Sequence, residues 1–397
     1  MIHLQYITIF IENKYLLHQP FHLNTSKRFA KENSNSIIDY RYKRTPQNVV
    51  YNLGKNEMKR IKIGQIGVCH EHADGKIKSL RNLPDVYEIV GIVDDRNSSA
   101  AKFSGDNLVP YEGLKWMSED ELFNTPSLQA VAVEPPNADL VPTAIRCMEN
   151  DLHIHMDKPA GEDIELFGQL LNGCKERNLA FQMGYMFRRN PAMQLCLKAI
   201  HQNWLGDIFE VQAGMSHNYG GEAYQQYMTN FKGGIMFNLG CHFIDFIISM
   251  LGRPENITPF LKSTPGIPAE PKNNCLTILQ YPYATVTLRA CSLEVDGLQH
   301  RRLKVCGTKG TVDLSPLERF DGEPLEMRLT LLEDNEEYNV GTHIVKFAGR
   351  NDRYREQLLE LAGIINGEIK NPYTYEHDYL VQETVLAAAG YTKWSKR

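Results

Sequence analysis

Between residues 60 and 186 the chain alternates short apolar segments with amphipathic ones, and this alternation limits the folds open to it. The apolar segments, rich in β-branched residues, are residues 60–68, 87–95, 128–136, 152–159 and 180–186. Between the last two, Ile164, Phe167, Leu170, Leu171 and Cys174 recur at helical spacing. Strands that alternate with helices predict a parallel sheet with right-handed crossovers. The fold class expected here is therefore α/β, with a Rossmann domain spanning residues 58–187.

After residue 205 the pattern changes to strands with few helices between them. These expected strands lie in residues 207–217, 275–282, 284–292, 301–315 and 326–334, and the turn at 307–310 suits a tight hairpin. Consecutive strands of this kind predict a mostly antiparallel sheet. A closing amphipathic helix is expected over residues 354–368. We therefore expect an α+β domain over residues 188–397 with an open-faced sheet.

The first 57 residues differ from the rest of the chain. Residues 1–53 contain no Gly and one Ala, and residues 1–57 hold eight Lys or Arg against four Asp or Glu, within a chain of net charge −5. An apolar stretch near the start is interrupted by Glu12, Asn13 and Lys14, so it makes a poor signal peptide. We expect residues 1–57 to be a disordered or mis-assigned extension, with the natural start at Met58.

Composition excludes several classes of protein. The mild negative charge argues against a nucleic-acid partner, and no apolar run is long enough to span a membrane. The eight cysteines form no C-x-x-C pair; they are Cys69, Cys147, Cys174, Cys196, Cys241, Cys275, Cys291 and Cys306. Scattered unpaired thiols fit a reducing compartment, so the expected location is cytoplasmic.

The first apolar segment runs into the sequence GVCHEHADG, residues 67–75, where a dinucleotide loop would follow its strand. A G-x-G-x-x-G loop forms a tight turn under a pyrophosphate and directs a helix N-terminus at it. Gly67 occupies the first glycine position, whereas Cys69 and His72 stand at the second and third. Two alternatives stay open: Cys69, His70 and His72 could bind a metal, or the histidines could only cap and pack the helix. We favour a divergent cofactor loop and expect no metal, because no fourth ligand stands nearby.

Two acids close the second strand. Asp94 and Asp95 stand 27 and 28 residues after Gly67, where an acid can accept both ribose hydroxyls of NAD and repel the 2′-phosphate of NADP. Arg96 follows and could bind that phosphate instead. The expected cofactor is NAD, with NADP as the alternative, and solvated loop acids are the plainer interpretation.

Two further motifs carry polar residues. Asp157-Lys158-Pro159 closes the fourth apolar segment, at a strand end where open α/β sheets bind ligands. Residues 233–245 open a helix in which Asn238, His242, Asp245 and Ser249 fall on one line, a polar seam beside an apolar face. His242 either serves the reaction or completes a hydrogen-bonded core network.

Taken in order, these motifs resemble the Gfo/Idh/MocA oxidoreductases (the glucose–fructose oxidoreductase and inositol dehydrogenase family), over residues 60–391. The family's E-K-P is matched by residues 157–159, its T-P-N turn by 135–137, its G-Y-x-x-R-x-N-P linker by 184–191, and its G-G-x-x-x-D-x-G-x-H-x-x-D helix by 233–245. The last predicted helix, within residues 375–391, also looks like the C-terminal helix of the family. The order of the motifs is more specific than any one of them.

The resemblance implies a dehydrogenase that moves hydride between a nicotinamide and a hydroxyl carbon of a sugar, glycoside or cyclitol. Lys158 would stabilise charge on the hydroxyl oxygen and His242 would take its proton, with Asn238 orienting the imidazole. The implied cofactor contacts are Gly67, Val68, Cys69, His70, His72, Asp94, Asp95, Pro136, Asn137, Asp157 and Lys158. The implied substrate contacts are Lys158, Tyr185, Arg188, His217, Asn238 and His242, with Tyr219 as a weaker candidate. A homodimer or homotetramer through the C-terminal sheet is the implied assembly.

The sequence departs from the family in ways that keep other functions open. Asp157 replaces Glu, Asn238 replaces an Asp that would stabilise the imidazolium, and two loop glycines are missing. One alternative is an enzyme of the same fold that recycles its NAD while cleaving a glycoside. The other is a non-catalytic sensor or partner subunit.

Overall fold

The computed structural model describes residues 60–218, 221–267, 270–319 and 321–395. The predicted extension (residues 1–57), the predicted natural start at Met58 and the candidate Tyr219 lie outside the described residues.

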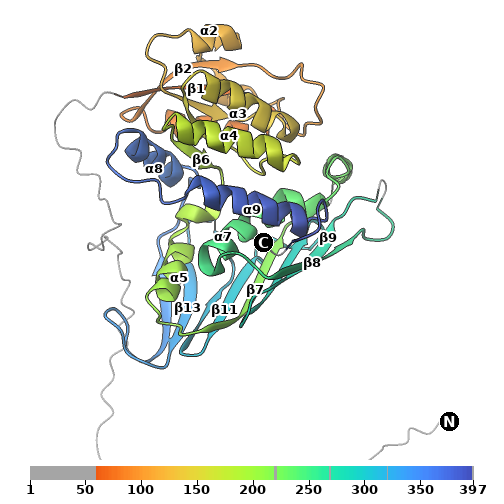
Figure 1. Cartoon of the computed structure of the whole chain (residues 1–397), viewed down its shortest axis with the longest axis vertical. Helices are drawn as coiled ribbons and strands as arrows, with labels where there is room; N and C mark the ends of the chain where they lie inside the picture. Colours follow the sequence, from red (N-terminus) through yellow and green to blue (C-terminus); the bar gives the residue numbers. More distant parts are fainter. Residues whose placement is uncertain (1–59, 219–220, 268–269, 320, 396–397) are drawn as a thin grey trace, which may run out of the picture. The chain divides into compact units, whose positions relative to one another are not determined.

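The first sheet has six parallel strands in the order β3-β2-β1-β4-β5-β6 (Figure 1). Its strands are β1 Ile61–Ile66, β2 Tyr87–Val93, β3 Trp116–Met117, β4 Ala130–Val133, β5 His153–Met156 and β6 Phe181–Met183. The helices between them are α1 Ala73–Arg81, α2 Glu119–Phe123, α3 Leu140–Glu149 and α4 Ile164–Glu176, with 3₁₀ turns at Val109–Tyr111 and Asn137–Asp139. Every residue of β4 is buried, as expected for a central parallel strand. The five strands predicted from the apolar segments all form.

The second sheet has eight strands in the order β14-β13-β12-β11-β7-β10-β9-β8. Its strands are β7 Ile208–Ser216, β8 Asn256–Lys262, β9 Asn274–Gln280, β10 Thr285–Cys291, β11 Arg302–Gly307, β12 Gly310–Leu314, β13 Leu325–Leu331 and β14 Gly341–Phe347. Only β7 and β10 pair in parallel, so the sheet is mostly antiparallel. The fold class predicted from the sequence is confirmed.

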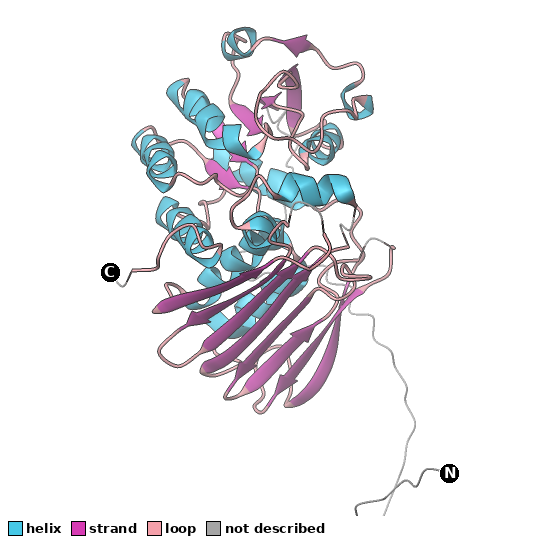
Figure 2. Cartoon of the chain, turned by 90° about the vertical axis from the view of Figure 1, so that its right-hand side faces the viewer, coloured by secondary structure: helices cyan, strands magenta, loops and turns pink. Residues whose placement is uncertain are grey.

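Helices gather on one face of the second sheet. They are α5 Pro191–His201, α6 Glu222–Met228, α7 Cys241–Leu251 and α9 Tyr375–Ala388, with a 3₁₀ turn at Met186–Arg189 and a π-helical turn at Met236–Gly240, whereas α8 Arg355–Ile365 lies beside the first sheet. α7 and α9 lie against each other over the sheet, and no described helix covers the opposite face (Figures 1 and 2). Along β13 buried and exposed residues alternate, as a strand with one covered and one open face requires.

The C-terminal part of the chain returns to the first sheet. The hydroxyl of Tyr87 donates to the carbonyl of Leu358 at 2.6 Å, and Gln182 Nε2 donates to the carbonyl of Gln357 at 3.1 Å. Both acceptors lie in α8, so this helix packs beside strands β2 and β6. The boundary predicted between residues 187 and 188 remains a prediction. α8 comes after this boundary in the chain, but it packs against the first sheet.

The remaining expectations concern thiols and membranes. All eight cysteines are free and buried. Within the described ranges, no helix has both the length and the apolar character that a membrane crossing would need.

Candidate functional site

The candidate site lies where the strand order of the first sheet reverses. β1 stands between β2 and β4, so the loops that follow β1, β4 and β5 meet at the carboxyl edge of the sheet. In open α/β sheets this switch point is where ligands bind. The three loops are residues 67–72, 134–139 and 157–161, and α1 begins directly after the first.

Gly67 is required by the close passage of two of these loops. Its φ is +95°, and a Cβ built on it would lie 2.3 Å from the backbone nitrogen of Pro135. A side chain is therefore excluded by both backbone strain and contact. The first glycine of the predicted cofactor loop thus has the conformation and the crowding that such a loop needs.

We expect Gly67→Ala to lower the free energy of unfolding by about 1–3 kcal/mol more than Gly113→Ala, because overpacking adds to the strain of a positive φ. Gly113 is the matched control: its φ is +77°, but nothing lies within 4 Å of the added Cβ. The measurement is urea unfolding of both variants, followed by NADH titration of each. Equal unfolding midpoints would show that the loops can separate without cost.

Asp95 and Asp94 have different roles at the end of β2. The amide of Val68 donates to Asp95 Oδ1 at 2.8 Å, while Asp95 Oδ2 is buried and receives no hydrogen bond from the described residues. Asp94 instead pairs with Arg96 at 2.6 Å, and this contact holds the pKa of Asp94 below its usual value. Asp95 is thus the acid with a free acceptor for a ribose hydroxyl.

A cavity of about 310 Å³ opens at this edge of the sheet. Its lining residues come from the ends of β1, β2 and β4, from α2 and α3, and from the 3₁₀ turn Asn137–Asp139; they are Ile66, Val93, Asp94, Asp95, Glu119, Pro135, Asp139, Pro142, Thr143 and Arg146. Pro136 precedes the turn Asn137–Asp139, and Asn137 Nδ2 donates to the carbonyl of Pro159 at 2.8 Å, joining two of the loops. The cavity, the tight turn at Gly67 and the unpaired Asp95 oxygen fit the ribose side of a dinucleotide.

Cys69 fills the second glycine position with a buried side chain. Burial and the neighbouring Asp95 raise the pKa of the Cys69 thiol to about 12. Among the described residues, the ligand atom that lies within 4.8 Å of those of His70 and His72 belongs to Asp157 and not to Cys69. Cys69 therefore does not join the two histidines in the metal site considered from the sequence.

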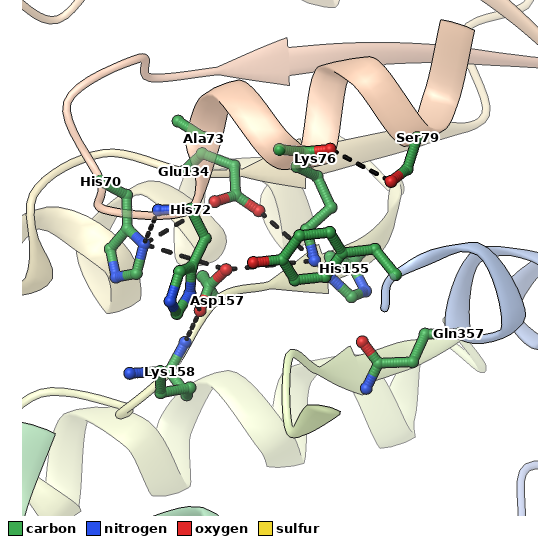
Figure 3. A network of polar contacts seen from close by, with 12 residues as sticks. His70, His72, Ala73, Lys76, Ser79, Glu134, His155, Asp157, Lys158 and Gln357 are labelled. Atoms are coloured by element: carbon green, nitrogen blue, oxygen red, sulfur yellow. Dashed lines mark hydrogen bonds and ion pairs between the residues drawn. The ribbon is translucent and has the colours of Figure 1, made fainter. Parts of the chain in front are cut away.

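His70 and His72 instead face a buried network of charged residues (Figure 3). His72 Nδ1 lies 3.0 Å from Asp157 Oδ1, and His70 Nδ1 lies 3.8 Å from Asp157 Oδ2. Burial alone would raise the pKa of Asp157, but the two histidines and Lys76 outweigh it and hold that pKa well below its usual value. Asp157 thus ties the first loop to the end of β5.

Lys158 and His242 form the reaction end of the site. Lys158 is 1 % exposed and its Nζ donates to the carbonyl of Asn238 at 2.8 Å. That carbonyl belongs to the π-helical turn Met236–Gly240, which interrupts the regular helical ladder. His242 follows in the first turn of α7, is 1 % exposed, and neither of its ring nitrogens has a hydrogen-bond partner among the described residues.

His242 sits among aromatic rings. Its ring centroid lies 6.0 Å from that of Tyr185 and 5.7 Å from that of Phe187. Burial and the charge of Lys158 lower the pKa of His242 well below its usual value. A neutral, unpartnered imidazole next to a lysine is able to accept a proton from a ligand.

Asn238 is held by two residues that the sequence did not single out. Its Nδ2 donates to Glu71 Oε1 at 3.2 Å, and its Oδ1 accepts from the Tyr224 hydroxyl at 3.2 Å. Glu71 stands between the two histidines of the first loop, so it brings a carboxylate to the position where the family resemblance implies Asp. The sequence analysis assigned no role to Glu71, because its partner Asn238 lies 167 residues further along the chain.

Arg188 and His217 were predicted to contact substrate, and the structure gives them other surroundings. The Arg188 guanidinium is buried, bound to Asp245 and Asp378 and stacked 3.8 Å from the ring of Tyr373. Its contacts link α7 to α9. His217 lies beside Arg301 and Arg353; burial and those two charges lower its pKa to about 3.

Comparison with known sequences agrees with this geometry. Residues 61–185 match the family model described as "Oxidoreductase family, NAD-binding Rossmann fold", and residues 193–313 match the "GFO/IDH/MocA C-terminal domain". Together these matches cover more than half of the chain.

The chain belongs to the Gfo/Idh/MocA family of oxidoreductases.

Relatives within the Gfo/Idh/MocA family are distant. The trans-1,2-dihydrobenzene-1,2-diol dehydrogenase of Bos taurus is 23% identical over 241 residues, which are 59% of this chain and 68% of the relative. The scyllo-inositol 2-dehydrogenase (NADP(+)) IolW of Bacillus subtilis is 23% identical over 210 residues, 52% of this chain and 56% of the relative.

Solved structures support the same Gfo/Idh/MocA fold. The aldose-aldose oxidoreductase of Caulobacter crescentus, complexed with glycerol, superposes with a TM-score of 0.68 at 17% identity, covering 85% of this chain and 100% of that one. GenD2 from gentamicin A biosynthesis, in complex with NAD, also gives 0.68 at 17% identity, covering 86% and 99%. The predicted family and the predicted nicotinamide cofactor are both confirmed.

Proposed function

We propose that the protein is an NAD-dependent dehydrogenase that acts on a secondary hydroxyl of a sugar, glycoside or cyclitol. The observation that carries this proposal is the buried His242, whose ring nitrogens have no hydrogen-bond partner among the described residues and whose pKa is lowered by burial and by the charge of Lys158. The names of the relatives, which mention inositol, a dihydrobenzene diol and aldoses, support a cyclic or polyhydroxylated substrate.

In the proposed reaction the protein handles the proton and the charge of the substrate hydroxyl. The nicotinamide, when bound, accepts the hydride from the carbon. His242 takes the hydroxyl proton, so that a carbonyl forms and the imidazole becomes imidazolium. Lys158 turns its ammonium from the Asn238 carbonyl to the substrate oxygen and stabilises the negative charge developing there. Asn238 cannot ionise, and the negative charge that favours the imidazolium comes from Asp157, which raises the pKa of His242 against burial and Lys158.

The same loops favour NAD over NADP. Asp95 offers an unpaired, buried carboxylate oxygen to a ribose hydroxyl, and a 2′-phosphate at that position would meet its charge. Arg96 is engaged by Asp94, which weakens its use as a phosphate ligand. Cofactor residues on the first loop would be Gly67, Val68 and Cys69, with Pro136 and Asn137 on the loop after β4.

The proposed function is tested by incubating the full chain with NAD⁺ or NADP⁺ and a panel of inositols, aldoses and aryl glycosides. Reduction of NAD⁺ by one substrate class is the expected result. Release of an aglycone without net NADH would replace the proposal with NAD-recycling glycoside cleavage. Failure to bind either nucleotide, once co-purified nucleotide has been removed, would favour a non-catalytic subunit.

We expect the rate of substrate oxidation to show no break near pH 6.5, because the pKa of His242 is lowered well below that value by burial and by Lys158. A base with a lowered pKa stays unprotonated, so kcat/KM holds level from about pH 8 to about pH 6 and falls only at lower pH. The measurement is kcat/KM against pH for the native enzyme and for His242→Gln. A break near pH 6.5 that disappears in His242→Gln would contradict the lowered pKa.

The open face of the second sheet is our proposed contact between copies of the chain. Phe260, Leu276 and Ile344 are exposed there by 45, 37 and 46 %. Apolar side chains on an uncovered sheet favour association. We expect Leu276→Lys to lower the molar mass measured by light scattering, with Leu332→Lys, an exposed residue just past β13, as the control. An unchanged mass for Leu276→Lys would remove this face as the interface.

A further inference from the structure

Four side chains from three loops converge beneath the start of α1 (Figure 3). His70 and His72 come from the loop after β1, Glu134 directly follows β4, and Asp157 directly follows β5. One ligand atom each of His70, His72 and Asp157 lies within 4.8 Å of the other two. The Nδ1 of His70 also lies 3.8 Å from Glu134 Oε2. Two imidazoles and two carboxylates thus face one small volume.

The carboxylates of this cluster are short of hydrogen-bond donors. Glu134 and Asp157 are fully buried, and neither Glu134 oxygen nor Asp157 Oδ2 receives a hydrogen bond from the described residues. Unpaired buried polar atoms are costly, and each such atom in a folded protein calls for an explanation. An additional cation at this point would provide one.

Lys76 does not fill that role. Its Nζ lies 3.9 Å from Glu134 Oε1 and 4.0 Å from Asp157 Oδ2, beyond hydrogen-bond distance. The ammonium is instead directed at His155 Nε2, 2.5 Å away. If both carboxylates are ionised, Lys76 balances only one of the two charges.

The spacing of the nitrogen and oxygen atoms suits a transition metal. With metal–ligand bonds of about 2.0–2.1 Å, neighbouring ligand atoms of a tetrahedral site stand about 3.4 Å apart. The measured separations are 3.0 Å from His72 Nδ1 to Asp157 Oδ1 and 3.8 Å from His70 Nδ1 to Asp157 Oδ2. His70 Nδ1 accepts a hydrogen bond from the His72 amide at 3.3 Å, so this nitrogen carries no proton. Because it has one lone pair, a bound metal would replace that hydrogen bond.

We propose that His70, His72 and Asp157 bind one divalent transition-metal ion of the Zn²⁺ class, with Glu134 as the fourth ligand. Two imidazoles with carboxylate oxygens are ligands that Zn²⁺ accepts in proteins. This ligand set differs from the one considered from sequence, since Asp157 and Glu134 take the place of Cys69. The ion would join the first loop to the strand end that carries Lys158. The proposal is independent of the substrate of the enzyme.

The test is metal binding by the full chain, purified without metal-affinity chromatography. After treatment with chelator and removal of the chelator, the protein is titrated with Co²⁺ and then with Zn²⁺, while visible absorption and bound metal by mass spectrometry are recorded. We expect about one ion per chain and a tetrahedral cobalt spectrum with no thiolate-to-cobalt charge-transfer band. His72→Gln and Asp157→Asn should each weaken binding by about 100-fold or more.

His153→Gln is the matched control, since His153 lies on the same strand as Asp157 but outside the cluster, where its Nδ1 accepts from the Ala180 amide. Its affinity for metal should equal that of the native chain. Equal binding by His72→Gln and His153→Gln would mean adventitious metal and overturn the proposal. So would a thiolate charge-transfer band, which would place Cys69 in the site.

Metal binding by the native chain tests the proposal even if a variant fails to fold. No bound metal in the native chain at equimolar Zn²⁺ would overturn the proposal and leave a proton as the occupant between the two carboxylates. Binding should also raise the unfolding temperature of the native chain, and added chelator should reverse the rise.

Discussion

Lys158→Ala is expected to lower kcat/KM for substrate oxidation by about 10²- to 10³-fold, the loss typical of removing one preorganised donor from a developing oxyanion. The ammonium is buried and its present acceptor is the Asn238 carbonyl. Because this acceptor is a backbone group, the bond can be exchanged for one to a substrate oxygen without leaving an ionised partner behind. The measurement is steady-state kinetics with the substrate class identified from the panel.

The matched control is Lys175→Ala in α4, whose lysine is 59 % exposed at its side chain and pairs with Glu376 on the surface. Its activity should equal that of the native enzyme. NADH titration of Lys158→Ala separates catalysis from folding: retained nucleotide binding with lost turnover supports the proposed role. Retained turnover would show that the lysine only holds the π-helical turn in place.

The backbone of the nucleotide-binding domain is readable from sequence because its signals are local. Parallel central strands are buried on both faces, so β1, β2 and β4 appear as short apolar runs wherever they occur. The helix α4 repeats its apolar residues at a spacing of three and four. Gly67 was likewise identifiable, since the strand before it and the acids of the next strand place it at the first turn.

Elements of the second sheet were harder to predict where the strand signal is weak. β8 contains Pro259 and faces solvent along most of its length, and β14 alternates exposed Thr342, Ile344 and Lys346 with partly or fully buried residues. Neither gives the continuous apolar run of a central strand. The sequence predicts one regular helix from Asn238 to Ser249. In the structure a π-helical turn precedes α7, and the Asn238 carbonyl accepts a hydrogen bond from Lys158.

The site itself depends on contacts between distant residues, which local patterns do not encode. His72 meets Asp157 85 residues further along the chain, and Asn238 meets Glu71 across 167. Arg188 illustrates the same limit. Its motif matches the family, but the motif does not reveal that Asp378, 190 residues later, occupies its guanidinium. Residue types were therefore predictable, while their partners were not.

Arg188→Met is expected to lower the free energy of unfolding by about 3–5 kcal/mol, because it leaves buried carboxylates without their cation. Arg188, Asp245 and Asp378 are each at most 2 % exposed at their side chains, and Arg188 donates to both acids. Methionine keeps much of the volume of the side chain, so the lower free energy of unfolding reflects the missing positive charge more than poorer packing. The measurement is the urea midpoint, with far-UV circular dichroism to check the fold.

The matched control is Arg177→Met, which breaks an ion pair with Asp151 at 2.7 Å on the surface, where the side chains are 41 and 71 % exposed. Exposed pairs contribute about 0–1 kcal/mol, so this variant should unfold almost as the native chain does. A loss for Arg188→Met no larger than that of Arg177→Met would mean that the buried acids take up protons without cost.

The pH dependence of the free energy of unfolding of the native chain and of Arg188→Met distinguishes a loss caused by unpaired charge from a loss caused by poorer packing. In the native chain burial would raise the pKa of Asp245, but Arg188 and His377 outweigh burial and hold it below its usual value. Burial raises the pKa of Asp378 even in the native chain. Without Arg188 the pKa of both acids would rise, and protonation would relieve the uncompensated charge as pH falls. The difference in the free energy of unfolding between the native chain and Arg188→Met should therefore become smaller from about pH 7 to about pH 5. A difference that stays constant over this range would assign the loss to packing, since an unfilled volume does not titrate.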